Sequence, residues 1–215
     1  MKNRIVAALC LTAGFYLLSE GLLFSQESKD AGPLKGLSQY IEKKMEEWKI
    51  PGLAIGVIQD DSVIFLRGFG FRDIDKKLPV TPQTLFGIGS ISKTFTAAAV
   101  GMLCDEGKLA WNAPIVEYLP DFRLYDEYAS FQTTPRDLLS HRTGLSPSSD
   151  LMVNFWPHER GEIFKRLRYL EPTSSFRGWY QYSNLSYVAA GTVVGKLSNG
   201  SWEEFVEKGF SSLSE

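Results

Sequence analysis

The chain has 215 residues, 44% of them apolar, and a formal net charge of −2, values typical of a globular protein with one well-buried domain or two small ones. It contains no dense run of Lys or Arg, so it lacks the electrostatic footprint of a nucleic-acid-binding protein. With only two histidines and two cysteines, a zinc cluster would need carboxylates for most of its ligands. We therefore expect a small-molecule or peptide partner, no nucleic acid, no metal and no other cofactor.

Residues 1–26 differ from the rest of the chain. Lys2 and Arg4 precede the apolar run IVAALCLTAGFYLL, and FSQ at 24–26 is a plausible cleavage zone, as in a secretory signal peptide. The alternative is an uncleaved membrane anchor, because the apolar stretch through Phe24 approaches spanning length. Both interpretations predict that residues 27–215 are exported to the periplasm or the extracellular space, with membrane contact only if the segment stays uncleaved.

The mature chain begins with a helix and a hairpin. Residues 35–48 carry apolar side chains at helical spacing, which predicts an amphipathic helix that ends at the IPG of 50–52. Residues 53–59 and 62–71 are β-rich apolar runs separated by Asp60-Asp61, the pattern of a hairpin. Because an isolated hairpin is marginally stable, we expect further sheet or covering helices around it.

The rest of the chain reads as helices and loops. Residues 90–106 are apolar nearly all round, which predicts a buried helix packed on the hairpin. Thr134-Pro135 predicts a helix start, with Thr134 as the N-cap and proline at the first helical position, and Ser201 and Glu204 predict a capping box for another helix. Residues 161–170 are amphipathic and residues 186–197 are mostly apolar, which predicts a helix over each range. The predicted class is α/β (α+β), an antiparallel sheet flanked by helices plus a helical lobe.

Ser90 and Lys93 form the first candidate site. Side chains three apart at a helix start share one face, and partial desolvation on an apolar helix would favour the neutral amine that can take a proton from a serine hydroxyl. The alternative is a Ser90 that only caps the helix and a Lys93 that reaches solvent. Two observations favour the catalytic pair: Gly87 and Gly89 allow a sharp turn or a close ligand approach, and the Ser-x-x-Lys match occurs once in the chain. They balance the helix-cap interpretation without excluding it, so both stay open.

Tyr182 and Asn184, in YQYSN before an apolar helix, are the second candidates. A phenol can relay a proton, and an amide can hold a carbonyl or another side chain. The alternative is an aromatic loop that packs under the helical lobe, with Asn184 as the helix cap.

Three segments together carry a resemblance. FGIGSISKTFTA, TTPRDLLSHRTGL and QYSNLSYVAAG occur in the order and rough spacing of the serine β-lactamase-like and penicillin-binding protein superfamily. The similarity spans about residues 37–208, and within the class C β-lactamase, D,D-peptidase and esterase branch it looks closest to serine peptidase-like members. It implies a β-lactamase/transpeptidase-like fold for residues 27–215.

The resemblance also implies roles. Ser90 would be the acylated nucleophile with its backbone N–H in the oxyanion hole, Lys93 its base, Tyr182 the proton relay, and Asn184 the residue that orients the substrate amide and Lys93. His141, in LLSHRTGL, is interpreted as a structural histidine. Tyr180, Trp179 and Trp156 line the substrate groove in one interpretation and pack in the core in the other.

The family's third motif, Lys or His followed by a small residue and Gly on an edge strand, is not found in the sequence. We therefore expect the C-terminal sheet strands to be missing and the hydrolase domain to be incomplete. Three hypotheses remain: a serine hydrolase of peptide, ester or β-lactam carbonyls, a non-hydrolytic domain that binds penicillin or cell-wall peptides, and an inactive truncated relic.

Overall fold

The computed structural model describes residues 32–150 and 159–211, so the predicted signal segment 1–26 lies outside the described residues. The chain divides into two compact units, Met1–Gly87 and Ile88–Glu215, which we describe separately. Within the described ranges, no helix is long and apolar enough to cross a membrane.

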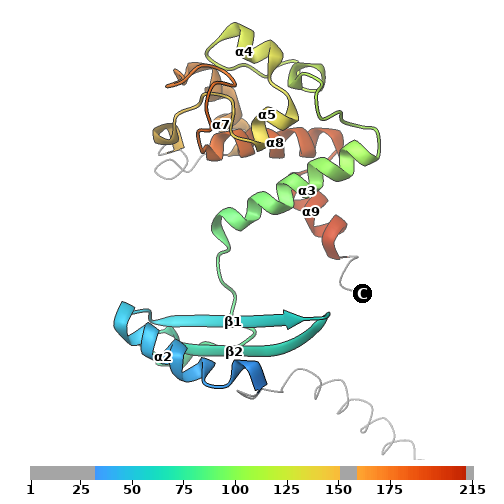
Figure 1. Ribbon diagram of the computed structural model, residues 1–215. Helices are drawn as coiled ribbons and strands as arrows, with labels where there is room; N and C mark the ends of the chain where they lie inside the picture. Colours follow the sequence, from blue (N-terminus) through green and yellow to red (C-terminus); the bar gives the residue numbers. More distant parts are fainter. Residues whose placement is uncertain (1–31, 151–158, 212–215) are drawn as a thin grey trace, which may run out of the picture. The chain divides into compact units, whose positions relative to one another are not determined.

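The first unit is a helix and a small antiparallel sheet (Figure 1). After the short turn η1 (Gly32–Leu34), α2 (Leu37–Trp48) leads into the strands, which lie in the order β1 (Gly52–Gln59), β2 (Ser62–Asp73) and β3 (Leu78–Pro79). Asp60 and Asp61 join β1 to β2 with φ of 49° and 59°, the left-handed pair that matches the twist of a two-residue hairpin. The predicted helix and hairpin are confirmed.

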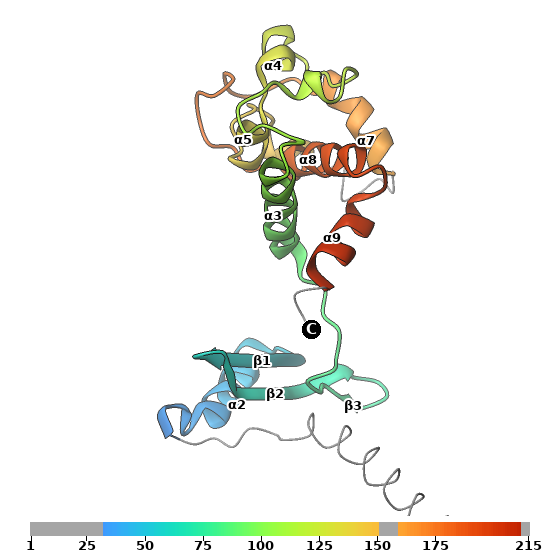
Figure 2. The same ribbon diagram turned by 90° about the vertical axis from the view of Figure 1, so that its right-hand side faces the viewer.

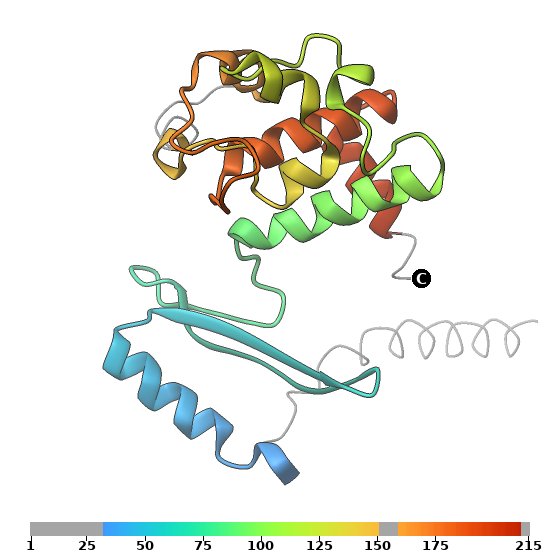
Figure 3. The ribbon, with the colours of Figure 1, turned by 45° about the horizontal axis from the view of Figure 1, so that its top comes forward.

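The core of this unit lies between α2 and the hairpin. Ile41 and Met45 of α2 are buried with Phe65 and Phe69 of β2, and α2 follows one face of the strands (Figure 3). Gly70 has a φ of 67°, and a Cβ there would collide with the carbonyl oxygen of Pro51. Only glycine therefore fits where β2 passes the start of β1.

The second unit is helical. Its elements are η2 (Gly89–Ile91), α3 (Ser92–Asp105), η3 (Ile115–Glu117), α4 (Glu127–Gln132), α5 (Pro135–Leu139), η4 (Pro147–Asp150), α7 (Arg160–Arg166), η5 (Leu167–Tyr169), α8 (Asn184–Leu197) and α9 (Trp202–Ser211). α8 is central, since it contacts α3, α5, α7 and α9 (Figure 2). This explains why α8 is mostly apolar, with Ala189, Val193 and Val194 buried.

Local capping places the ends of these helices. Thr134 and Asp137 form a reciprocal capping box at α5, and Ser201 and Glu204 bond each other's backbone N–H at α9, as predicted. The predicted helix at 90–106 is confirmed as η2 followed by α3, which packs on α8 and α9. That this helix also covers the hairpin stays a prediction.

Candidate active site

Ser90 lies in the η2 turn, one residue before the N-cap of α3. That N-cap is Ile91, which makes no side-chain capping bond, and the exposed hydroxyl of Ser90 is engaged elsewhere. Its Oγ lies 2.6 Å from the phenol oxygen of Tyr182 and accepts a hydrogen bond from Lys93 Nζ at 3.2 Å. The interpretation of Ser90 as a mere helix cap is therefore wrong.

Lys93 connects the two candidate pairs. Its half-buried Nζ donates to Asn184 Oδ1 at 2.5 Å as well as to Ser90. Nζ also lies 4.8 Å from the ring centroid of Tyr182 and 5.4 Å from that of Tyr187. The lysine does not extend into solvent, because an amide oxygen and two aromatic faces hold it beside the serine.

Tyr182, at the end of the loop before α8, and Asn184, the first residue of α8, lie on either side of the buried Ser183. Ser183 is the N-cap of α8 and accepts a hydrogen bond from the N–H of Ser186, so Asn184 is the first helical residue rather than the cap. That leaves its amide oxygen to accept from Lys93. All four predicted site residues meet in one hydrogen-bonded set.

His141 holds the chain on both sides of Tyr182. Its Nδ1 accepts from the N–H of Ser183 at 3.0 Å, and its carbonyl oxygen accepts from the N–H of Gln181 at 2.9 Å. The ring is buried, with its centroid 4.8 Å from that of Tyr182 and 5.2 Å from that of Tyr187. His141 is thus a buried, hydrogen-bonded histidine that positions the phenol.

Tyr187 is a residue that sequence reasoning missed. Burial raises the pKa of its phenol above the ordinary value, as do the neighbouring Tyr182 and Tyr180. The hydroxyl therefore stays protonated and donates to the carbonyl oxygen of Leu139. Its place one turn after Asn184 on α8 was the available signal.

Sequence reasoning also missed an ion pair between Arg177, in the loop that leads to Tyr182, and Asp137 of α5. Arg177 donates from Nε and a terminal nitrogen to the two carboxylate oxygens of Asp137, at 2.9 and 2.7 Å. Burial alone would raise the pKa of Asp137, but hydrogen bonds from Arg177 and Thr134 outweigh burial and hold the pKa below its usual value. The carboxylate therefore stays charged and anchors the segment that leads to Tyr182.

A groove of about 440 Å³ opens beside Ser90. Its lining comes from η2, α3 and α8, with Arg160 and Trp202 at a further end: Gly89, Ser90, Ser92, Lys93, Thr96, Arg160, Asn184, Tyr187, Val188, Gly191 and Trp202. Tyr180 and Trp179 are 67% and 74% exposed, so they neither pack in the core nor line this groove. Trp156 lies outside the described residues.

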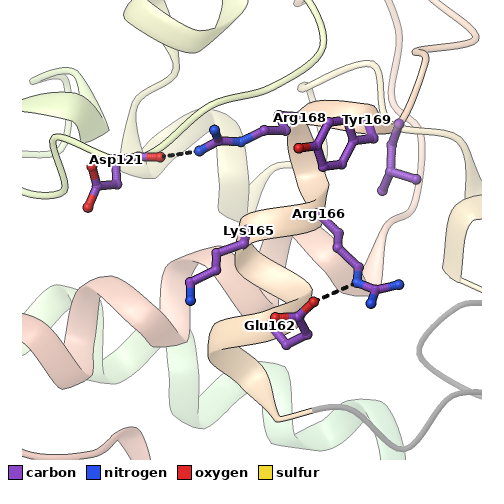
Figure 4. Close-up of a pocket in the computed structure, with 7 residues that line it drawn as sticks. Asp121, Glu162, Lys165, Arg166, Arg168 and Tyr169 are labelled. Carbon is purple, nitrogen blue, oxygen red and sulfur yellow. Dashed lines mark hydrogen bonds and ion pairs between the residues drawn. The ribbon is translucent and has the colours of Figure 1, made fainter.

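A larger hollow of about 620 Å³ lies around α7 and η5 (Figure 4). Its basic side chains diverge, with Arg166 paired to Glu162 at 2.9 Å and Arg168 donating to the carbonyl oxygen of Asp121. It contains none of the candidate site residues. In the described part of the chain, no group of three or more His, Cys, Asp or Glu side chains is placed to hold a metal ion.

The fold and the serine–lysine pair at the start of a helix define the β-lactamase/transpeptidase class, and the comparisons agree. The model of the family named Beta-lactamase matches residues 37–212. An unguisins hydrolase of Aspergillus campestris is 32% identical over 186 residues, covering 82% of this chain and 34% of the relative. The chain therefore belongs to the Beta-lactamase family, and the predicted resemblance is confirmed.

Solved structures give the same result. The octameric penicillin-binding protein homologue from Pyrococcus abyssi is 32% identical with a TM-score of 0.72, covering 82% of this chain and 42% of that one. A class C β-lactamase from Rhodobacter sphaeroides is 28% identical with a TM-score of 0.66, covering 82% and 48%. The predicted mixed α and β class is confirmed, and the chain spans about a third of the length of its curated relatives and less than half of these structures.

Proposed function

We propose that this chain carries the nucleophilic half of a serine hydrolase that acts on peptide, ester or β-lactam carbonyls through an acyl-enzyme on Ser90. The observation that supports it is the set of hydrogen bonds among Ser90, Lys93, Tyr182 and Asn184. Serine needs a neighbouring base to become a nucleophile, and a lysine nitrogen 3.2 Å from the hydroxyl meets that need.

The acylation step follows from this geometry. Ser90 Oγ bonds to the substrate carbonyl carbon while its proton passes to the neutral form of Lys93, and the backbone N–H of Ser90 stabilises the oxyanion. When the carbon–leaving group bond breaks, Tyr182 gives its proton to the departing nitrogen or oxygen and recovers one from Lys93. Asn184 keeps Lys93 directed at Ser90.

Deacylation uses the same groups in reverse. The attacking water gives its proton to Tyr182 as Tyr182 passes its own proton to Lys93, and Lys93 then returns that proton to Ser90 Oγ as the acyl–oxygen bond breaks and the acid product is released. We also infer, from residues 1–26 alone, that the protein is exported and meets its substrate outside the cytoplasm.

Covalent labelling tests the proposal. A fluorophosphonate and a fluorescent penicillin are incubated with the full chain, and the labelled residue is identified by mass spectrometry. We expect Ser90 to be labelled, Ser90→Ala to abolish labelling, and Lys93→Met or Tyr182→Phe to slow it by about a hundredfold or more.

Ser198→Ala is the matched control, because that hydroxyl donates to the carbonyl oxygen of Gly195 at the end of α8 and does not line the groove beside Ser90. Equal labelling of the wild type and Ser90→Ala would contradict the proposal. Stable labelling of Ser90 by penicillin without product release would instead favour the non-hydrolytic binding function.

A further inference from the structure

The groove beside Ser90 continues away from the reacting atoms along one face of α8. Asn184, Val188 and Gly191 lie four and three residues apart, so they share a face, and all three line the groove. At a rise of 1.5 Å per residue, Gly191 lies about 10 Å beyond Asn184 along the helix axis. That length matches about three residues of extended peptide.

The far end of the groove is closed by Arg160 and Trp202. The guanidinium of Arg160 lies 5.3 Å from the indole ring, and both groups approach Gly191, where a Cβ would stand 3.5 Å from Trp202 Cδ1 and 3.6 Å from Arg160 Nε. Because Gly191 has no side chain, the floor of the groove stays low at this point.

Arg160 is not an isolated cation, because its positive charge is paired with the carboxylate of Glu203. Its two terminal nitrogens donate to the two carboxylate oxygens of Glu203 at 3.0 and 2.7 Å, which lowers the pKa of that carboxyl group. The pair is therefore neutral overall at neutral pH, which favours an uncharged acceptor over an anionic ligand.

Two donors at this end lack an acceptor within the described ranges of the chain. Arg160 Nε makes no hydrogen bond to a described residue, and the indole N–H of Trp202 is buried without a partner there. Buried donors are nearly always satisfied, and an unpaired one costs about 1–3 kcal/mol, which applies to the indole N–H of Trp202. The Arg160 side chain is 33% exposed and lines the groove, and a carbonyl oxygen is the neutral group that its Nε would bind.

The position of Tyr182 decides which side of the substrate occupies the groove. Tyr182 shares a hydrogen bond with Ser90 but does not line the groove, whereas Lys93 and Asn184 do line it. If Tyr182 protonates the leaving group, that group departs on its side, and the acyl portion lies over α8.

We propose that the groove from Ser90 to Arg160 binds an extended peptidyl acyl group, and that Arg160 is a specificity residue that donates to a carbonyl about three residues from the scissile bond. This inference rests on the proposed function of Ser90 and adds the substrate class, an acyl chain with backbone carbonyls. A compact acyl group would leave the far end of the groove empty.

Three diphenyl phosphonates test this inference by mimicking acylation. The short probe is acetyl-alanine phosphonate, the long probe carries two further alanines, and the alkyl probe replaces those two alanines by a hydrocarbon chain of equal length. In each reaction Ser90 Oγ bonds to phosphorus, one phenolate leaves, and the hydroxyl proton ends on the phenol. The readout is the second-order rate of labelling at Ser90 in the full chain.

We expect the long probe to react at least about tenfold faster than the short and alkyl probes. Arg160→Met should bring this ratio close to one without changing the rate of the short probe, and Arg166→Met, a paired arginine outside the groove, should leave the ratio intact. Gly191→Ala should lower the ratio severalfold, because the added methyl group raises the floor, while Gly101→Ala, in the middle of α3 and outside the groove, should not.

Other results would contradict either the subsite or the role of Ser90. Equal rates for the short and long probes, or a ratio that survives Arg160→Met, would overturn the extended subsite while Ser90 remains the nucleophile. An alkyl probe as fast as the long probe would overturn the carbonyl contact. Failure of the short probe to label Ser90 would overturn the proposed function, and this inference with it.

Discussion

Replacing His141 should loosen the chain around Tyr182 in a way that depends on one hydrogen bond. In His141→Ala the N–H of Ser183 loses its acceptor, which costs about 1–3 kcal/mol for a buried donor. The loss of the ring from between Tyr182 and Tyr187 adds about 1–2 kcal/mol. We expect a total of about 2–5 kcal/mol.

His141→Asn separates these two contributions. Asparagine places an oxygen as many bonds from the backbone as Nδ1, and it tolerates the left-handed φ of 58° found at this position. It should keep the hydrogen bond from Ser183 and lose only the ring. The two variants should therefore differ by about 2 kcal/mol, or about thirtyfold in an opening equilibrium.

The assay is the hydrogen-exchange rate of the Ser183 amide, measured by NMR at a pH where exchange follows local opening. Exchange should rise far more in His141→Ala than in His141→Asn, and phosphonate labelling of Ser90 should slow in the same order. If the Ser183 amide exchanges equally fast in both variants, the hydrogen bond to Nδ1 does not hold this segment.

Two further predictions concern the anchoring pair and the hairpin. Because the pKa of Asp137 lies below its ordinary value of 3.8, its charge stabilises the fold above that pH, and the contribution is lost as pH falls through the folded-state pKa. At pH 6 the free energy of unfolding of the wild type should exceed that of Asp137→Asn by about 1–2 kcal/mol, a modest difference because Arg177 is 39% exposed. Urea unfolding should show this difference disappear as the pH falls below 3.8, and a difference that stays constant with pH would contradict the reasoning. In the first unit, Gly70→Ala should destabilise the hairpin by about 2 kcal/mol or more, while Gly56→Ala, whose Cβ would stand 3.6 Å from Leu66, should cost under about 1 kcal/mol; similar amide exchange of β1 and β2 in both variants would refute the collision with Pro51.

Features encoded within a few residues could be predicted from the sequence. The Asp60-Asp61 hairpin, the N-cap at Thr134 and the capping box at Ser201 follow from local backbone chemistry, which neighbouring residues decide. The Ser90 and Lys93 pair belongs to the same kind, because a separation of three residues near a helix start already brings side chains together.

The supports of the site could not be predicted in this way. His141 and Ser183 are 42 residues apart in the sequence, and Asp137 and Arg177 are 40 apart. Over such separations, residue type and spacing do not show which side chains will lie close together. The choice of Ser183 over Asn184 as the cap of α8 was equally open, since both residue types cap helices well. Only the packed unit decides between them.

The contacts of Ser90 with Tyr182 and of Lys93 with Asn184 span 92 and 91 residues, so the site closes one of the longest loops in the second unit. Pairing of residues so far apart is slow, because loop closure must precede any stabilisation from such contacts. On the proposed function, Ser90 should therefore acquire its labelling rate during refolding only when α8 has docked on α3. A reagent that labels Ser90 would then report the completion of this part of the native topology in a single measurement.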